Sequence, residues 1–213
     1  KYKMFIDGEW VDSESKKTFK MLNPETNEPW AEVPEANEKD IDKAVKAAQK
    51  AFEGSWPSLF PRERASYLRA IANELRENAE LLGKIETIDT GKLFKETKNQ
   101  ANYIAEYYDY YAGLADKVEG TVLPIDKANM QVITTRVPIG VVAAIIPWNS
   151  QMLLTAVKLA PALAMGNTVV IKSSELAPAT LFEFGKLIEK TKIPKGVVNI
   201  VSGYGEPCGK SLT

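Results

Sequence analysis

Two groups of polar residues directly follow apolar runs in the second half of the chain, and both could do chemistry. Lys172 and Glu175 come after the run 168–171. A carboxylate accepts hydrogen bonds from adjacent hydroxyls and an ammonium donates to their oxygens, so this pair suits a ribose. Asn149 follows the run 140–146. Its amide could donate to a developing oxyanion, worth roughly 3 kcal/mol in rate terms, or it could cap a helix, worth about 1 kcal/mol.

A set of glycines after a third apolar run could let the backbone approach a pyrophosphate, because glycine has no Cβ. Gly203, Gly205 and Gly209 form the spacing GxGxxxG. This departs by one residue from the dinucleotide fingerprint GxGxxG, and an ordinary strand-to-helix loop explains the same glycines. The only cysteine, Cys208, lies inside this loop.

One lysine, Lys158, stands alone in the apolar helical stretch 152–165, whose other residues leave no obviously wet face. Such a lysine must snorkel to solvent, pair with an acid or be functional, and the pattern leaves these alternatives open. The stretch is shorter than the roughly 20 residues of a membrane span and also contains Pro161, so we expect no membrane segment.

The elements that must position these residues alternate between strand and helix. Apolar runs at 140–146, 168–171 and 197–201 are separated by helical patterns at 152–165 and 180–190. Right-handed crossovers make such strands parallel, so their carboxyl ends share one edge of a sheet. The sequence therefore predicts an α/β fold with a Rossmann-like parallel sheet of buried strands, flanked by helices.

The N-terminal half of the chain predicts hairpins and then helices. Asp7-Gly8 lies between two β-prone pieces and indicates a hairpin, and strands are expected at 18–22 and 30–33. Amphipathic helices are expected from Glu38, from Pro61 with one apolar face continuing to Leu82, and over 94–115. Five tyrosines in the last helix predict aromatic packing: Tyr103, Tyr107, Tyr108, Tyr110 and Tyr111.

The stretch 120–137 interrupts the helical pattern with two extended pieces and reads as a hairpin arm. Pro124 lacks the N–H that a central strand needs, so the first piece belongs on an edge. Such an arm could pair with another subunit by strand addition, or it could fold on its own domain.

The composition excludes several function classes. The chain has 213 residues, of which 27 are basic and 28 acidic. It therefore lacks the excess of positive charge that would predict a nucleic-acid partner. With no histidine, His-based triads and His-ligated metals are excluded, and we expect no metal site. One cysteine permits no internal disulfide, and a cytoplasmic protein is the expectation.

Separate motifs along the whole chain resemble the aldehyde dehydrogenase superfamily in order and spacing. They are FIDGEW (5–10), NPET (23–26), IDTGK (88–92), YYAGLADKVEGTVLPID (110–126), PIGVVAAIIPWN (138–149), KLAPALAMGNTVV (158–170), IKSSE (171–175) and GVVNIVSGYG (196–205). Two positions depart from the family pattern: Ser173 stands where proline is usual, and Ser150-Gln151 follow Asn149 where an aromatic is common.

The resemblance implies oxidation of an aldehyde through a cysteine thiohemiacetal, with hydride transfer to NAD. Its cofactor-binding positions are Ile145, Ile146, Pro147, Trp148, Asn149, Lys172, Ser174, Glu175, Gly205 and Gly209. Asn149 would donate to the oxyanion and Lys158 would belong to a proton relay. A carboxylate at Glu175 would repel the 2′-phosphate of NADP and so favours NAD, although Lys172 and Ser174 could still accommodate NADP. The arm implies a homodimer or homotetramer.

The same resemblance places the catalytic cysteine, the general-base glutamate and the catalytic domain beyond residue 213. We therefore expect residues 1–119 to hold N-terminal strands and helices, 120–138 the oligomerisation arm, and 139–213 an incomplete first half of the nucleotide-binding core, inactive alone. Another hypothesis is a naturally short, non-catalytic relative that acts as a binding or assembly module.

Overall fold

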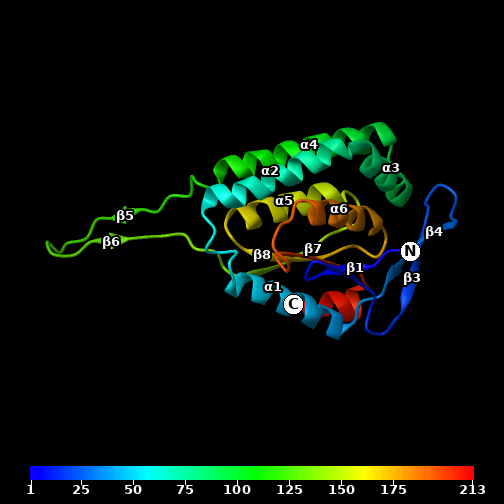
Figure 1. The fold of residues 1–213 in the computed structure, drawn as a ribbon, viewed down its shortest axis with the longest axis horizontal. Coiled ribbons are helices and arrows are strands. Elements are labelled where there is room, and N and C mark those ends of the chain that lie inside the picture. Colours follow the sequence, from blue (N-terminus) through cyan, green and yellow to red (C-terminus); the bar gives the residue numbers. More distant parts are fainter.

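The computed structural model describes all 213 residues and is built around a five-stranded mixed sheet (Figure 1). Its strand order is β2-β1-β9-β8-β7. The strands are β1 (Met4–Ile6), β2 (Glu9–Val11), β7 (Val141–Ile145), β8 (Thr168–Lys172) and β9 (Val198–Val201). β7, β8 and β9 are parallel, which confirms the predicted α/β order, whereas β1 is antiparallel to both β2 and β9.

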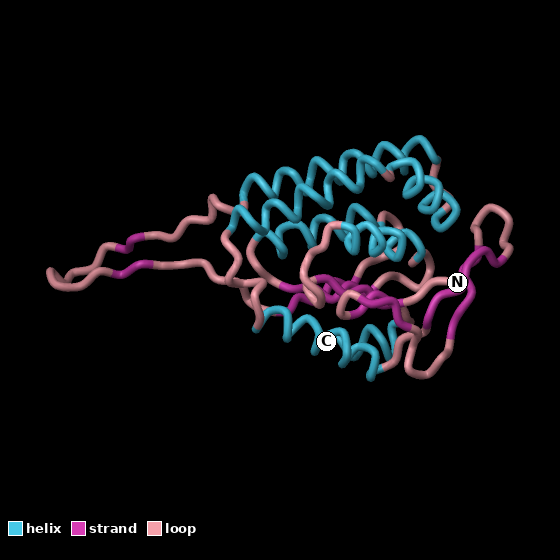
Figure 2. The backbone as a smooth tube through the Cα atoms, viewed as in Figure 1, coloured by secondary structure: helices cyan, strands magenta, loops and turns pink.

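Helices lie on both faces of this sheet (Figures 1 and 2). On one face lie α5 (Gln151–Ala164) and α6 (Ala179–Lys190), covered in turn by α2 (Pro61–Glu77), α3 (Ala79–Thr90) and α4 (Phe94–Leu114). On the other face lies α1 (Glu38–Glu53), close to the short C-terminal turns η1 (Gly205–Gly209) and η2 (Lys210–Leu212). No helix is both long and apolar enough to cross a membrane.

The first hairpin forms as predicted, because Asp7 and Gly8 both adopt left-handed backbone angles, φ +52° and +72°. A two-residue turn of this kind matches the twist of its strands. The hairpin joins the main sheet through the pair Phe5 and Ile200, and the Asp7 N–H donates to Asn199 Oδ1 at 3.0 Å. The N-terminus thus extends the sheet on the far side of β9.

The prediction of one helix from Pro61 to Leu82 is wrong, because Asn78 interrupts it. Asn78 has φ −110° and ψ 13°, and its Nδ2 donates to the Glu74 carbonyl at 2.8 Å. The backbone N–H of Asn78 still donates to the same Glu74 carbonyl at 3.1 Å, so the break lies in the non-helical backbone angles of Asn78, which its side-chain bond supports. Leu82 stays buried, so the apolar stripe continues across the break.

The tyrosines of α4 divide between two faces. Only Tyr108 is buried, 6.3 Å from the Phe184 ring, whereas Tyr103 and Tyr110 are 55% and 60% exposed. Tyr107 packs on Tyr111 with ring centroids 5.1 Å apart, at the surface. The packing prediction is therefore correct for Tyr108 and for the half-buried Tyr107 and Tyr111, which pack against the core, whereas Tyr103 has no aromatic partner.

The segment 120–137 is a hairpin that projects away from the layers (Figures 1 and 2). Its two short strands, β5 (Val122–Leu123) and β6 (Val132–Ile133), pair antiparallel. Val122 and Ile133 are 61% and 58% exposed. The alternative that this hairpin folds back on its own domain is therefore wrong.

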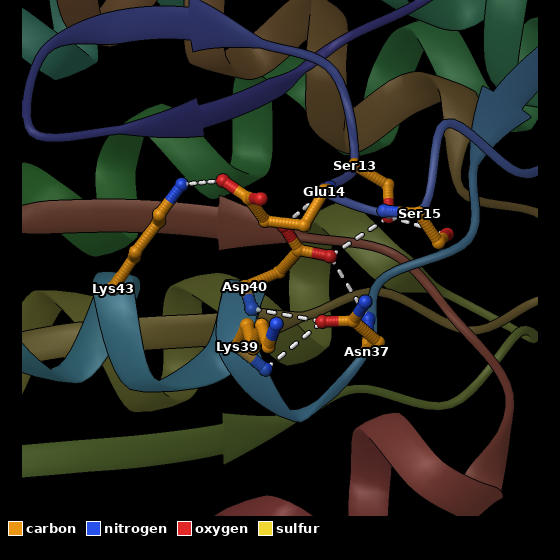
Figure 3. Close-up of polar contacts among 7 residues, drawn as sticks. All are labelled: Ser13, Glu14, Ser15, Asn37, Lys39, Asp40 and Lys43. Atoms are coloured by element: carbon orange, nitrogen blue, oxygen red, sulfur yellow. Dashed lines mark hydrogen bonds and ion pairs between the residues drawn. The ribbon is translucent and has the colours of Figure 1, made fainter.

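The start of α1 is held by one buried carboxylate, that of Asp40 (Figure 3). It accepts hydrogen bonds from Ser13 Oγ at 2.8 Å and from the backbone N–H groups of Glu14 and Asn37, both at 2.9 Å. Asn37 caps the helix in return. This clamp fixes the loop that leads from the main sheet to the separate hairpin of β3 (Thr18–Leu22) and β4 (Pro29–Pro34).

Candidate functional site

The carboxyl ends of the three parallel strands meet at one edge, as the strand register requires. Ile145 is paired with Lys172, and Lys172 is paired with Val201. The Ile146 N–H donates to the Lys172 carbonyl at 3.0 Å, and the Ser173 N–H donates to the Val201 carbonyl at 2.9 Å. The segments 146–149, 173–175 and 202–205 therefore leave the sheet side by side.

The segment that leaves β7 is mostly open to solvent. Ile146 is buried, but Pro147 is exposed, and Ile145 and Trp148 are 49% and 52% exposed. The prediction that this strand is buried is wrong, since only Ala144 among the strand residues is buried. The reason is that β7 has a single neighbour in the sheet and leaves its other edge free.

Asn149 does not cap the following helix, which corrects that interpretation. The capping position is Ser150, and α5 begins at Gln151. The side chain of Asn149 makes no hydrogen bond within the protein and lies exposed at the end of the strand edge. Its amide is thus available to a reacting group.

The Ser150 hydroxyl also makes no capping bond; instead it accepts from Lys92 Nζ at 2.5 Å. Lys92 lies in turn 3.6 Å from the buried carboxylate of Glu86. This contact joins the end of α3 to the start of α5 across 58 positions of sequence. Sequence reasoning gave Lys92 and Glu86 no role, although Lys92 belongs to the quoted motif IDTGK, and it noted Ser150 only as a departure from the family pattern.

Lys172 and Glu175 form an ion pair at the edge, with Nζ and Oε2 3.4 Å apart. Lys172 is buried and also donates to the Ser173 carbonyl at 3.0 Å, while the Glu175 side chain is 36% exposed. Of the three Nζ protons, two are engaged and one stays free. Ser174 is buried, and its Oγ accepts from the Leu176 N–H at 3.2 Å.

The glycines after β9 have different surroundings. A Cβ on Gly205 would meet no atom within 4 Å, so its backbone is open to an approaching group. A Cβ on Gly209 would touch Lys172 Cε at 3.7 Å, an ordinary contact. A Cβ on Gly203 would lie 2.7 Å from Cys208 Cβ, so this glycine is required by packing within the loop.

Cys208 is poorly suited to be a nucleophile. It is fully buried, and burial raises the pKa of its thiol to about 11, although Lys172 opposes the shift. The thiolate is the reactive form, so a thiol with this pKa is almost entirely protonated at neutral pH.

Lys158 lies on the exposed face of α5 and makes no hydrogen bond or ion pair. The inference that its helix has no wet face is wrong, because Leu153, Leu154 and Val157 are also only partly buried. Its ammonium therefore needs no partner in this chain.

Two buried carboxylates on α3, Glu86 and Asp89, were not predicted. Asp89 Oδ2 accepts from the N–H of Ala179, the first residue of α6, at 2.8 Å. Burial raises the pKa of Asp89 to about 7 and outweighs the backbone N–H donors, which act in the opposite direction. Both acids lie on the same buried face of α3 as Leu82. Acidic residues at the spacing of a buried helix face were the sequence signal that could have identified them.

A hollow of about 410 Å³ opens beside the strand edge and is lined by residues that include Trp148, Glu175 and Tyr204. A larger one, about 630 Å³, lies between the N-terminal strands and α6, and none of the predicted site residues lines it. No group of three or more acidic or cysteine side chains is placed to hold a metal ion.

Comparison with known proteins places this arrangement in a family. The model described as "Aldehyde dehydrogenase family" matches residues 10–213. The chain is 48% identical over 213 residues to (Z)-2-((N-methylformamido)methylene)-5-hydroxybutyrolactone dehydrogenase of Acinetobacter baylyi, covering 100% of this chain and 43% of that protein. It is 42% identical to betaine aldehyde dehydrogenase of Bacillus subtilis, covering 98% and 43%.

Solved structures agree. Aldehyde dehydrogenase from Bacillus cereus superposes with a TM-score of 0.96 at 39% identity, over 100% of this chain and 43% of that one. Betaine aldehyde dehydrogenase from Staphylococcus aureus in complex with NAD+ gives 0.95 at 37% identity, over 99% and 43%. The chain thus spans less than half the length of these relatives, and its predicted Rossmann-like fold is confirmed. It belongs to the aldehyde dehydrogenase family.

Proposed function

We propose that these 213 residues belong to a longer NAD(P)-dependent aldehyde dehydrogenase, in which they supply cofactor contacts and the amide that binds the oxyanion. The observation that carries this proposal is Asn149. In a chain of this family, its amide stands exposed and unbonded at the carboxyl edge of the parallel strands.

The edge fits a dinucleotide in two respects. Glu175 presents a partly exposed carboxylate to accept from ribose hydroxyls, and Lys172 holds that carboxylate while keeping one proton free. The open backbone at Gly205 leaves room for a pyrophosphate. We assign further cofactor contacts to Ser174, Gly209 and the stretch Ile145–Trp148. NAD is the proposed cofactor, NADP is the alternative, and when bound the cofactor would accept the hydride from the substrate.

The residues of this chain act on the aldehyde oxygen. A cysteine thiolate from outside the 213 residues attacks the aldehyde carbon, and the carbonyl oxygen takes up the negative charge of the thiohemiacetal. Asn149 Nδ2 donates to that oxygen, which stabilises the charge most where it is largest. Loss of hydride leaves a thioester that water hydrolyses to the carboxylic acid. Lys158 is assigned to the proton relay by its place in the family motif, and its side chain makes no hydrogen bond or ion pair within this chain.

Cys208 supports an external nucleophile, because it is the only cysteine of the chain and is buried with a raised pKa. The free edge of β7 supports a longer polypeptide, since an uncovered strand edge is an aggregation hazard. The chain alone is therefore expected to be inactive. In this proposal residues 139–213 are an incomplete nucleotide-binding core, which follows the arm at 120–138 and the N-terminal strands and helices of residues 1–119.

The arm supports self-association of the whole enzyme as a homodimer or homotetramer. Its strands are short, unpaired on their outer edges and lined by exposed Val122 and Ile133. The same feature favours the second candidate, a short non-catalytic relative that works only as an assembly module. Aldehyde-dependent NADH formation by the native protein, together with its intact mass, separates these candidates. Turnover supports the enzyme, while a native chain of this size without turnover supports the module.

Replacement of Asn149 tests the site itself. In the active enzyme, Asn149→Ala should lower kcat by roughly 10²- to 10³-fold, the usual effect of removing one oxyanion donor. NAD affinity should change little, because the cofactor keeps its ribose contacts. A variant with wild-type kcat would refute the assigned role.

A further inference from the structure

The contact between Lys92 and Ser150 lies one residue from the proposed catalytic amide. Gly91 ends α3 in a left-handed conformation, φ +76°, with its N–H donating to the Thr87 carbonyl. This turn sends Lys92 toward the start of α5, where Nζ donates to Ser150 Oγ at 2.5 Å. Two helices distant in sequence are thus joined beside Asn149.

Lys92 is itself held by a buried acid. Glu86 is 2% exposed, and its Oε1 lies 3.6 Å from Lys92 Nζ. Burial raises the pKa of Glu86, and the Lys92 ammonium opposes that shift. The ammonium thus partly offsets the cost of burying the carboxylate, and the carboxylate fixes the position from which Lys92 reaches Ser150.

Few other contacts could orient the turn between β7 and α5. Asn149 has no side-chain partner, and Gln151 is fully buried with neither amide atom hydrogen-bonded. The Ser150 carbonyl accepts from the Leu154 N–H at 2.9 Å as part of the helix, but its hydroxyl binds only Lys92. The direction of the Asn149 amide thus depends on how Ser150 is held.

We propose that Lys92, held by Glu86, is a positioning residue that orients Asn149 through the Ser150 hydroxyl. This rests on the proposed function of Asn149 as the oxyanion donor. Lys92 touches neither the reacting atoms nor the cofactor in this assignment, so its effect should pass through Asn149 alone.

Steady-state kinetics on the whole enzyme can test this dependence. Lys92→Met and Ser150→Ala should each lower kcat by roughly 10- to 100-fold, the effect of a small misplacement of a reacting group. The aldehyde KM should stay within about threefold, because the substrate pocket keeps its walls. Ser150→Thr, which keeps the hydroxyl, should retain most of the activity. Lys95→Met is the matched control, an exposed lysine of the same segment without any ion pair, and should match the wild type.

The double variant gives the decisive result. If Lys92 acts through Asn149, then Lys92→Met combined with Asn149→Ala should be no slower than Asn149→Ala alone. The proposal would be overturned if the kcat losses of the two single variants multiplied in the double variant. It would also be overturned if Lys92→Met were as active as Lys95→Met. Should Lys92→Met fail to fold by near-UV circular dichroism, the Ser150→Ala and Ser150→Thr pair decides by the same cycle. A wild-type protein without turnover would refute the proposed function instead, so the two failures are distinct.

Discussion

Asp89 should make the stability of the protein fall as the pH rises from about 4 to about 7. Its carboxyl is 3% exposed, its Oδ2 accepts one backbone N–H, and its Oδ1 has no partner. Burial raises its pKa from 3.8 to about 7, and the nearby Glu86 charge adds to the shift. The folded protein therefore binds this proton more tightly than the unfolded chain does.

The sign and size of the effect follow from that difference. Well below pH 3.8 the carboxyl is protonated in both states, so its stabilising contribution is complete. As the pH rises to about 7, the unfolded chain releases the proton and the folded protein keeps it at a growing cost. A shift from 3.8 to about 7 corresponds to at most about 4 kcal/mol of unfolding free energy at pH 8, at about 1.4 kcal/mol for each pKa unit.

Asp89→Asn removes the titration while keeping a carbonyl oxygen for the Ala179 N–H. We expect the variant to be the more stable by only about 1 kcal/mol at pH 4.5, and by up to about 4 kcal/mol at pH 8. Urea unfolding at both pH values measures this, with Asp12→Asn at an exposed ion pair as the control. Glu86 titrates in both proteins, and Asp89→Asn also removes the repulsion between the two carboxylates. Parallel pH profiles for wild type and Asp89→Asn would refute the reasoning.

Three further changes test other regions of the molecule. Glu175→Ala should weaken NAD binding roughly 10-fold or more, which is the value of a hydrogen bond to a charged group. The variant should also bind NADP better relative to NAD. Unchanged NAD affinity in calorimetry would count against the ribose role. Ile133→Ser, at an arm position 58% exposed, should lower the oligomer fraction in analytical ultracentrifugation while leaving the far-UV circular dichroism unchanged, and an unaltered assembly would exclude the arm. Asp40→Ala should cost about 2–4 kcal/mol in urea unfolding, because it removes the acceptor of two partly buried backbone N–H groups and of the buried Ser13 hydroxyl. Exposed Asp42→Ala is its control, and equal losses would contradict the clamp.

The predictable features of this chain are those set by neighbouring residues. Asp-Gly at 7–8 specifies a left-handed turn wherever it lies, and alternating apolar strands and helices specify parallel crossovers. The break at Asn78 was missed because helix periodicity continues through it. The exposure of β7 and of the outer tyrosines depends on which elements pack against them. The local sequence pattern does not indicate which elements these are.

In the candidate site, too, some features follow from the local sequence and others depend on contacts between distant residues. The register Ile145–Lys172–Val201 follows from parallel pairing, so the gathering of the three polar segments at one edge could be predicted. The interpretation of Asn149 as a cap was reasonable for an amide near a helix start, yet it is wrong by one residue. The contact of Lys92 with Ser150 joins residues 58 positions apart, and no local pattern indicates it.

These observations together explain why an uncapped Asn149 suits the proposed chemistry. An asparagine that caps a helix accepts a backbone N–H through Oδ1, and this bond fixes its amide plane against the helix. Here Ser150 takes the capping position and Lys92 binds its hydroxyl, so both atoms of the Asn149 amide stay unbonded. Donors cost no reorganisation only when their direction is set before the charge develops. In the proposed arrangement Ser150 sets that direction, and the kinetic cycle between Lys92 and Asn149 measures how strongly the oxyanion donor depends on the Lys92 contact.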